Sequence, residues 1–253
     1  MALIEDLSEI AEAAGKITLK YFKSGSLKVE LKSDQSPVTI ADRETEQWIR
    51  DEVKRRFPDD QVIGEEFGEG PGAKGARRWI VDPIDGTKSF IHGVPLYGVM
   101  IGVEVDGEMV AGAVNMPALG ELVVAERGRG CYMNGAPCGV SAVSDLGQAM
   151  VLTTDLRNHA ERGQSESFER VHSRCRLLRT WGDCYGHLLV ATGRAEVMLD
   201  PEMNPWDCAA LMPILIEAGG TFTDYSGKVT VYGPDAFSTN GKLYDEVLGL
   251  LRG

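Results

Sequence analysis

The sequence predicts an α/β protein whose first half is α+β, and three patterns carry that prediction. Apolar residues recur at helical spacing near the start of the chain, apolar runs around an Asp-Gly turn indicate antiparallel strands over 97–115, and strand and helix patterns alternate after about residue 139. With 253 residues, 43% of them hydrophobic, the chain can bury a large core. We expect two closely joined halves, 1–139 and 140–253, because no repeat or long linker separates them.

Two helices are expected before the first sheet. The first is predicted by an apolar stripe that ends near Ser24 and Gly25. The second runs from about Ala41 to Phe57 and is stopped by Pro58. The intervening residues, 28–39, are too polar for assignment. The stripe of the first helix consists of Ile4, Leu7, Ile10, Ala11, Ala14, Ile17 and Tyr21.

The strands of the first half are expected after an acidic, glycine-rich loop over 65–75. Residues 78–81 form an apolar strand that leads directly into a pair of aspartates. A β-hairpin is predicted over 97–115, because Asp106 and Gly107 supply the positive φ angles of a tight turn. A further strand covers 122–125. The first half is therefore predicted to be two helices packed on a largely antiparallel sheet.

The second half is predicted to alternate between strands and helices. The helix expected over 206–218 ends at Gly219 and Gly220, whose flexible backbone suits a helix C-terminus. The other predicted helices cover 165–173, 185–192 and 243–251, and the predicted strands cover 150–153, 176–178, 197–199 and 221–223.

The charge balance excludes several function classes. Lys and Arg number 26 against 38 Asp and Glu, so a net charge of −12 should repel nucleic acid and anionic lipid. Since neither an 18-residue apolar run nor a signal-peptide pattern occurs, we expect no membrane contact and a cytoplasmic location. Five cysteines without a Cys-x-x-Cys pair argue against a disulfide framework and a zinc site, so reduced thiols are expected.

The segment over 79–87 carries the most chemical information. Its apolar strand ends in Asp82 and Asp85, which flank Pro83 and Ile84. Because Pro83 fixes its own φ angle and favours an extended residue before it, both carboxylates and the Ile84 carbonyl are free to converge on a hard cation. The alternative is that the two aspartates only begin a helix as caps.

Two further carboxylate positions favour metal binding over capping. Glu65 and Glu66 lie in the loop before this strand, and Asp207 follows Trp206 at the start of a later helix. Each is an ordinary loop or helix-start residue when taken alone. Together, without a cluster of His or Cys, they describe an all-oxygen site, and the sequence predicts two or three bound Mg²⁺ ions.

These motifs resemble, in order, the three signatures of the inositol monophosphatase superfamily. They are Gly64-Glu65-Glu66, the segment 82–87, and Trp206-Asp207 ahead of residues 217–220; Lys32 and the segment 39–42 extend the match over essentially the whole chain. The resemblance implies a layered αβαβα sandwich, a homodimer, and Mg²⁺-dependent hydrolysis of a phosphate monoester. It also implies that lithium inhibits this hydrolysis.

Within that superfamily the chain is most similar to the histidinol-phosphate phosphatase branch. Residues 89–95 depart from the Asn-Phe motif usual in inositol phosphatases, and the segment 182–185 resembles one found in that branch. Asp183 falls where inositol phosphatases carry a small or hydroxyl residue, and a carboxylate there favours a cationic amine or imidazole over a neutral polyol. An N-cap role for Asp183 is equally consistent with the sequence.

The resemblance also implies a metal-binding role for five residues. Glu65, Asp82 and the Ile84 carbonyl are expected to hold the first Mg²⁺. The second Mg²⁺ is expected to bind Asp82, Asp85 and Asp207, so Asp82 bridges the two ions. The bound ions would neutralise the phosphate, lower the pKa of a bound water and stabilise the leaving alkoxide, without a covalent phosphoenzyme.

The remaining site residues are expected to hold water, phosphate and substrate. The resemblance places Glu65 and Thr87 beside the attacking water, with Asp42 able to orient Thr87. The phosphate is expected to contact Asp85 and the backbone amides of Gly86 and Thr87. Substrate contacts are expected from Asp183 and Asp200, although Asp200 with Pro201 also fits a simple turn.

Three functions remain open from the sequence. The first is histidinol-phosphate phosphatase, and the second is an inositol-1-phosphatase or a broad sugar-phosphate phosphatase. The third is a non-catalytic, metal-binding regulatory protein, which would have no need to retain Glu65, Thr87 and Asp207 together. The four histidines have no metal-ligand spacing, so surface or packing roles are expected for them. Lys32 fits either a phosphate contact or a solvated loop.

Overall fold

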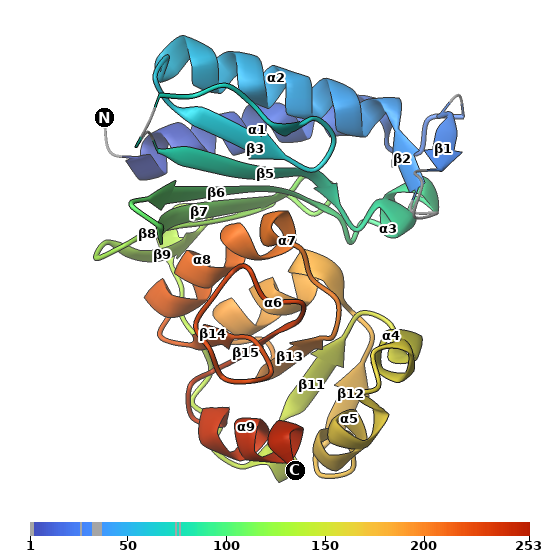
Figure 1. Ribbon diagram of the computed structural model, residues 1–253. Helices are drawn as coiled ribbons and strands as arrows, with labels where there is room; N and C mark the ends of the chain where they lie inside the picture. Colours follow the sequence, from blue (N-terminus) through green and yellow to red (C-terminus); the bar gives the residue numbers. More distant parts are fainter. Residues whose placement is uncertain (1–2, 26, 32–36, 74, 76) are drawn as a thin grey trace.

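The computed structural model describes residues 3–25, 27–31, 37–73, 75 and 77–253. Layers of helices and sheets alternate through the molecule, and Figure 1 shows five of them. Helices α1 (Leu3–Tyr21) and α2 (Ile40–Arg56) cover the outer face of an eight-stranded sheet. The predicted layered αβαβα sandwich is confirmed.

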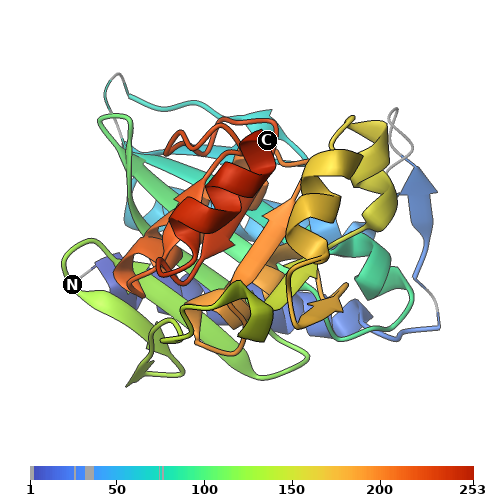
Figure 2. The ribbon, with the colours of Figure 1, turned by 90° about the horizontal axis from the view of Figure 1, so that it is seen from below.

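The inner and outer helix layers of the second half lie on either side of a five-stranded sheet (Figures 1 and 2). The inner layer, between the two sheets, consists of α6 (Asp183–Ala191), α7 (Pro205–Ala209) and α8 (Leu211–Glu217). The outer layer consists of α4 (Leu156–Glu161), α5 (Ser165–His172) and α9 (Tyr244–Arg252).

The first two helices form where the apolar stripe and the stop at Pro58 predict them. The buried face of α1 includes Leu7, Ile10 and Ala14, which pack with Trp79 of the sheet in one apolar cluster. At the start of α2, Thr39 is the N-cap residue and forms a capping box with Asp42. The predicted N-terminal part of the fold is therefore confirmed at both helices.

The eight-stranded sheet has the order β10-β9-β8-β7-β6-β5-β3-β4. The predicted hairpin is β6 and β7, which turn at Asp106 and Gly107, both with positive φ. Among the described residues of this sheet, β3 and β5 pair in parallel and the other neighbouring strands are antiparallel. The strands are β3 (Gln61–Gly64), β4 (Gly68–Glu69), β5 (Arg78–Asp85), β6 (Gly98–Val105), β7 (Glu108–Met116), β8 (Glu121–Glu126), β9 (Gly130–Met133) and β10 (Ala136–Pro137).

The five-stranded sheet has the order β12-β11-β13-β15-β14. The pairs of β11 with β12 and β13 are parallel, whereas β15 runs antiparallel to both β13 and β14. The strands are β11 (Met150–Thr153), β12 (Leu177–Arg179), β13 (Val197–Asp200), β14 (Thr221–Thr223) and β15 (Ala236–Thr239).

Several elements differ from the sequence prediction. The single helix expected over 206–218 is two helices, α7 and α8, and this prediction was wrong. Pro213 lacks the backbone N–H that would bond to the Ala209 carbonyl, so the helix is interrupted at Ala210 and Pro213 lies in the first turn of α8. The short strand β15 was missed because its four buried residues have no alternation of polar and apolar side chains.

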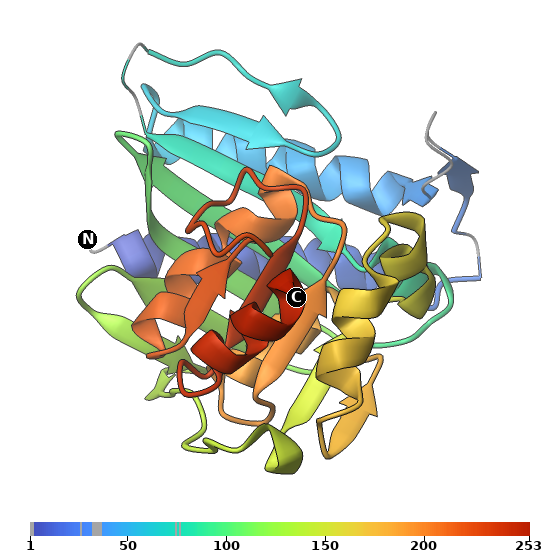
Figure 3. The ribbon, with the colours of Figure 1, turned by 60° about the horizontal axis from the view of Figure 1, so that its bottom comes forward.

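Short elements were also missed within segments predicted as loops or left unassigned. Strands β1 (Val29–Leu31) and β2 (Pro37–Thr39) pair within the polar stretch after α1, and this ribbon lies at the edge of the molecule (Figure 3). Strand β4 lies in the acidic loop. Lys32 lies outside the described residues. Among the described residues, no helix combines the length and apolarity needed to cross a bilayer.

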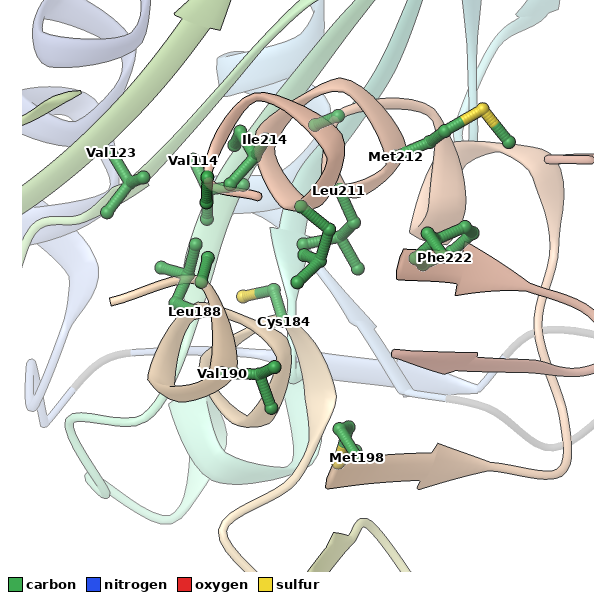
Figure 4. Close-up of a cluster of buried hydrophobic side chains, with 14 of the residues drawn as sticks. Val114, Val123, Cys184, Leu188, Val190, Met198, Leu211, Met212, Ile214 and Phe222 are labelled. Atoms are coloured by element: carbon green, nitrogen blue, oxygen red, sulfur yellow. The ribbon is translucent and has the colours of Figure 1, made fainter. Parts of the chain in front are cut away.

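The largest apolar cluster joins the two sheets through the inner helices (Figure 4). Val114 and Val123 of the first sheet, Leu188 of α6 and Leu211 of α8 are fully buried in it. Phe222 from the second sheet packs in the same cluster. Because this core is continuous, the ends of α6 and α7 are held at fixed positions relative to β5.

Two glycines let the inner helices approach the first sheet closely. A Cβ atom at Gly102 of β6 would lie 2.5 Å from the backbone carbon of Ala209. A Cβ atom at Gly112 of β7 would lie 2.2 Å from the carbonyl oxygen of Ala210. These contacts leave no room for a side chain, and they set how closely the junction between α7 and α8 approaches the first sheet.

Candidate active site

A cleft of about 380 Å³ opens where β5, α6, β13 and α7 meet. We call it the carboxylate cleft, because most of its charged side chains are acidic. Its acidic residues are Glu65, Asp82, Asp85, Asp155, Asp183, Asp200, Glu202 and Asp207, and Lys88 is the basic residue among those that line it.

Two carboxylates of the cleft come from the irregular end of β5. The pairing of β5 with β6 shifts register between Asp82 and Asp85, as a bulge there would require. The Ile84 N–H donates to Asp82 Oδ1 at 2.9 Å, and the Thr87 hydroxyl donates to the Ile84 carbonyl at 3.0 Å. The irregular end of β5 therefore fixes the Asp82 carboxylate and the Ile84 carbonyl through its own hydrogen bonds.

Asp207 reaches the same place from the second half of the chain. It is the third residue of α7, which begins with Pro205, and it forms a capping box with Asn204. The Asn204 N–H donates to Asp207 Oδ2 at 2.7 Å. This bond leaves the other carboxylate oxygen of Asp207 available to the cleft.

Asp82, Asp85 and Asp207 form a compact acidic cluster. One oxygen from each lies within 4.8 Å of the others. Burial and then the neighbouring carboxylates raise the pKa of Asp82 and of Asp85 well above the usual value for aspartate, and chiefly burial raises the pKa of Asp207 to about 7. A cation would relieve this repulsion, and three carboxylate oxygens suit a hard divalent ion.

Glu65 lines the same cleft from the loop after β3. The buried side chain of Glu46, on α2, accepts hydrogen bonds from the backbone N–H groups of Glu66 at 2.7 Å and Phe67 at 3.2 Å. A Cβ atom at Gly64 would lie only 2.1 Å from the Glu46 carboxylate. Glu46 therefore holds the Glu65 loop on α2, a role that sequence reasoning missed.

Asp42 lies close to the cleft but its hydrogen bonds are with the start of its own helix. Its Oδ2 accepts from the Thr39 N–H at 2.8 Å and from the Thr39 hydroxyl at 2.6 Å. Burial raises the pKa of Asp42 to about 6, with a smaller contribution from Glu65. Since the Thr87 hydroxyl donates to Ile84 here, the orientation of Thr87 by Asp42 stays a prediction.

Asp183 faces the loop after β5 from the start of α6. The N-cap residue of α6 is Gly182, and Asp183 itself has a positive φ of 53°, so the N-cap role considered for Asp183 is not what the fold uses. Gly86 also has a positive φ, and a Cβ atom there would lie 3.0 Å from Asp183 Oδ2. Burial raises the pKa of Asp183 to about 6, whereas Lys88 lowers it.

One hydroxyl group connects Asp183 with Asp200. The Thr154 hydroxyl accepts from the Asp183 N–H at 2.8 Å and donates to Asp200 Oδ2 at 2.8 Å. Next to it, the Cys184 N–H donates to Asp85 Oδ2 at 2.6 Å. Thr154 and Cys184 were missed as site residues, because a threonine after a strand and a backbone amide carry no sequence signal of such contacts.

The structure thus brings together nine of the ten predicted site residues in one cleft. Asp42 does not line the cleft and lies just behind it. Those that line it are Glu65, Asp82, Ile84, Asp85, Gly86, Thr87, Asp183, Asp200 and Asp207, of which Ile84 contributes only its backbone to the predicted metal site.

The family model for the inositol monophosphatase family matches residues 3–250. The chain therefore belongs to the inositol monophosphatase family, as its motifs predicted.

Curated relatives and solved structures are similar over nearly the whole chain. A histidinol-phosphatase from Chlorobaculum parvum is 53% identical over 88% of this chain and 86% of that protein. A histidinol-phosphatase from Streptomyces coelicolor is 37% identical over 96% of this chain and 94% of that protein. The extragenic suppressor protein SuhB from Bartonella henselae superposes with a TM-score of 0.92 at 28% identity, covering 100% of this chain and 99% of that one.

Proposed function

We propose that this protein is a Mg²⁺-dependent phosphate monoesterase that hydrolyses histidinol phosphate. The single observation that carries the general activity is the cluster of Asp82, Asp85 and Asp207, with oxygens within 4.8 Å of one another in an open cleft. The relative that is 53% identical and named histidinol-phosphatase supports the substrate. A non-catalytic metal-binding protein would explain the cluster but not the similarity to a relative named histidinol-phosphatase.

The metal ligands proposed are those that the sequence motifs imply. Glu65, Asp82 and the Ile84 carbonyl would hold one Mg²⁺, and Asp82, Asp85 and Asp207 a second. Bound Mg²⁺ would supply positive charge for the phosphate and lower the pKa of a coordinated water. The chain's own contribution is to hold these oxygens in place through the Asn204, Cys184 and Glu46 hydrogen bonds described above.

Substrate phosphate and water are assigned to the loop after β5. The amides of Gly86 and Thr87 would donate to the phosphate, and the positive φ of Gly86 lets the backbone approach it without a Cβ atom in the way. Glu65 and the Thr87 hydroxyl would accept or orient the protons of the attacking water. Asp42 would act through the electrostatics of the site, because its charge contributes to the raised pKa of Asp82 and Glu65 contributes to its own raised pKa.

A cationic substrate group is proposed to bind between Asp183 and Asp200. Thr154 holds the Asp183 backbone N–H and the Asp200 carboxylate next to each other, and both residues line the cleft. Burial raises the pKa of both groups, and neighbouring carboxylates raise that of Asp200 further, so an ammonium or imidazolium group there would gain more than a neutral hydroxyl. This preference distinguishes histidinol phosphate from inositol 1-phosphate, the second candidate substrate.

The test compares kcat/KM for histidinol phosphate, inositol 1-phosphate and fructose 1,6-bisphosphate in the presence of Mg²⁺. We expect histidinol phosphate to be preferred by about a hundredfold or more, which corresponds to roughly 3 kcal/mol. Equal rates, or a lead for inositol 1-phosphate, would leave only the general phosphatase activity.

Asp183→Asn provides the matched variant for this test. It keeps the size of the side chain and removes the charge, so kcat/KM for histidinol phosphate should fall about 10- to 100-fold. The rate with inositol 1-phosphate should change less than about threefold. A uniform loss for both substrates would instead assign Asp183 to folding or metal binding, and the melting temperature of the variant separates those two cases.

Two properties of the whole enzyme belong to the same proposal. We infer a homodimer, to be measured as a molar mass of twice 27.5 kDa in light scattering. We also infer inhibition by Li⁺ in competition with Mg²⁺, to be measured by titrating both ions. A monomeric mass or Li⁺-insensitive turnover would contradict the respective inference without affecting the choice of substrate.

A further inference from the structure

Two cysteines lie opposite each other at the outer edge of the eight-stranded sheet. Strands β9 and β10 are antiparallel, with Met133 opposite Ala136 and Tyr132 opposite Pro137. The next pair in this register is Cys131 and Cys138. The Cys138 N–H donates to the Cys131 carbonyl at 3.0 Å, and the two Sγ atoms are 3.4 Å apart.

The turn between the strands fixes this arrangement. Its two residues, Asn134 and Gly135, have φ angles of 48° and 78°, as a tight turn that matches the twist of a hairpin requires. The Asn134 side chain accepts from the Leu122 N–H at 2.8 Å and donates to the Gly120 carbonyl at 2.9 Å. Hydrogen-bonded residue pairs of antiparallel strands have Cα atoms about 5.5 Å apart, which lies within the range that a disulfide spans.

The two thiols have different surroundings. Cys131 is buried in the apolar cluster between the sheets, and its hydrogen bond with Cys138 and burial raise the pKa of its thiol. The pKa of Cys138 is lowered, first by the hydrogen bond with Cys131 and then by the positive charge of Arg194. Arg194 is held there by Glu121, whose two oxygens accept from it at 2.9 and 2.8 Å.

We propose that Cys131 and Cys138 are a redox-active dithiol that a low-molecular-weight disulfide oxidises to an intrachain disulfide. The half-buried Cys138 reacts first, as the thiolate, and attacks one sulfur of the small disulfide, which releases one small thiolate. The Cys131 thiol then gives up its proton to solvent and attacks Cys138 Sγ, which releases the second small thiolate. Overall, the two protein thiols are oxidised and one small disulfide is reduced to two thiols.

The crosslink would lie where the chain leaves the first sheet for the second half. Directly after Cys138, the Val140 N–H donates to the Ala218 carbonyl at 3.1 Å, just past the end of α8. On the other side, Glu217 of α8 accepts from the N–H groups of Gly128 at 2.9 Å and Gly130 at 2.8 Å. A disulfide would therefore reinforce a junction that is already hydrogen-bonded to α8.

Neither cysteine lines the carboxylate cleft, so oxidation should act on stability and not on catalysis. The ring closed by the disulfide is short, and such rings restrict the unfolded chain modestly. We expect the melting temperature of the oxidised protein to rise by about 2–6 °C, with kcat/KM unchanged within twofold.

The experiment uses the full chain, fully reduced and then incubated with glutathione disulfide at pH 8. Remaining thiols are alkylated and the peptides are mapped by mass spectrometry. The expected result is one linkage, Cys131 to Cys138, and a fall in free thiols from the five that the chain contains to three. Dithiothreitol should restore all five. Cys175, which is also partly buried, serves as the internal control for nonspecific oxidation.

Single variants separate the roles of the two thiols. Cys131→Ser should accumulate a mixed disulfide between glutathione and Cys138, because no second thiol resolves it. In Cys138→Ser, Cys131 should react with glutathione disulfide at least tenfold more slowly than Cys138 does in the wild-type protein. Cys131 should therefore stay reduced over the same incubation. Arg194→Gln should slow the first step at least threefold, whereas Arg194→Lys, which keeps the charge, should retain most of the wild-type rate.

Two outcomes would overturn the inference. One is a stable mixed disulfide at Cys138 in the wild-type protein with no Cys131–Cys138 linkage. The other is oxidation of Cys175 at a rate equal to that of the pair. Both are read from peptide masses, so they do not depend on the identity of the substrate.

Discussion

Replacement of Asp207 by asparagine should remove activity and, without metal, stabilise the fold at alkaline pH. Asparagine keeps the volume of the side chain and an oxygen that can accept from the Asn204 N–H, so the start of α7 is preserved. It removes one of the three charges that lie within 4.8 Å of one another. The same substitution therefore tests two effects of Asp207 separately: its contribution to catalysis, and the amount by which its charge destabilises the metal-free protein.

The size of the effect follows from the pKa of Asp207, which burial raises from 3.8 to about 7 in the folded protein. The folded state then binds more protons than the unfolded state, so the free energy of unfolding falls as pH rises toward 7. Between pH 5 and pH 7 the loss is about two units of about 1.4 kcal/mol each, or about 3 kcal/mol. Asparagine does not titrate and escapes this loss.

The assay is thermal unfolding in EDTA at pH 5 and pH 8 for both proteins. For a chain of this size about 3 kcal/mol corresponds to roughly 6–12 °C, so the melting temperature of Asp207→Asn relative to wild type should rise by that amount between the two pH values. The buried histidines titrate in both proteins and cancel. Asp145→Asn, which removes a helix-capping aspartate outside the cleft, controls for the loss of a charge.

The reasoning would be refuted if the difference in melting temperature between Asp207→Asn and wild type changed by less than about 2 °C from pH 5 to pH 8. Turnover of Asp207→Asn should fall at least a hundredfold at saturating Mg²⁺, because one ligand charge is lost. Near-native turnover would remove Asp207 from the metal site even if the stability result agreed.

Three further predictions concern the residues that support the cleft and the metal that it is proposed to bind. Gly112→Ala should lower the melting temperature by at least about 4 °C, because the new Cβ atom meets Ala210. Gly249→Ala, on the open face of α9, should leave the melting temperature unchanged or raise it by about 1–3 °C. Calorimetry that finds equal shifts for the two variants would contradict the packing argument. Glu46→Gln should raise the Mg²⁺ concentration needed for half-maximal rate about tenfold, because the Glu65 loop loses a charged hydrogen-bond acceptor. An unchanged concentration would mean that the Glu65 loop keeps its conformation without Glu46. EDTA should abolish phosphate release, and added Mg²⁺ should restore it; metal-independent turnover would refute the proposed chemistry. Mg²⁺ should also raise the melting temperature of the protein more at pH 8 than at pH 5, because protons compete with the ion for the carboxylates.

Local features of the fold could be predicted because short stretches of sequence determine them. The stripe of α1, the Asp106-Gly107 turn and the strand before Asp82 were all predicted from residues within a few positions of one another. The break between α7 and α8 at Ala210 was predictable in principle, since Pro213 cannot donate the helical hydrogen bond to Ala209. The buried strand β15 was not, because its pairing partners β13 and β14 decide its conformation.

The sequence by itself determined the family, the order of the motifs and the acidic character of the cleft, because residue types and their spacing are enough to specify them. Only the tertiary structure decided that Asp207 lies with Asp82 and Asp85, since that distance depends on Gly102 and Gly112 admitting the inner helices to the sheet. It also decided which residues support the cleft. Glu46 and Thr154 act through bonds to groups 20 or more residues away, and such contacts exist only once the layers pack.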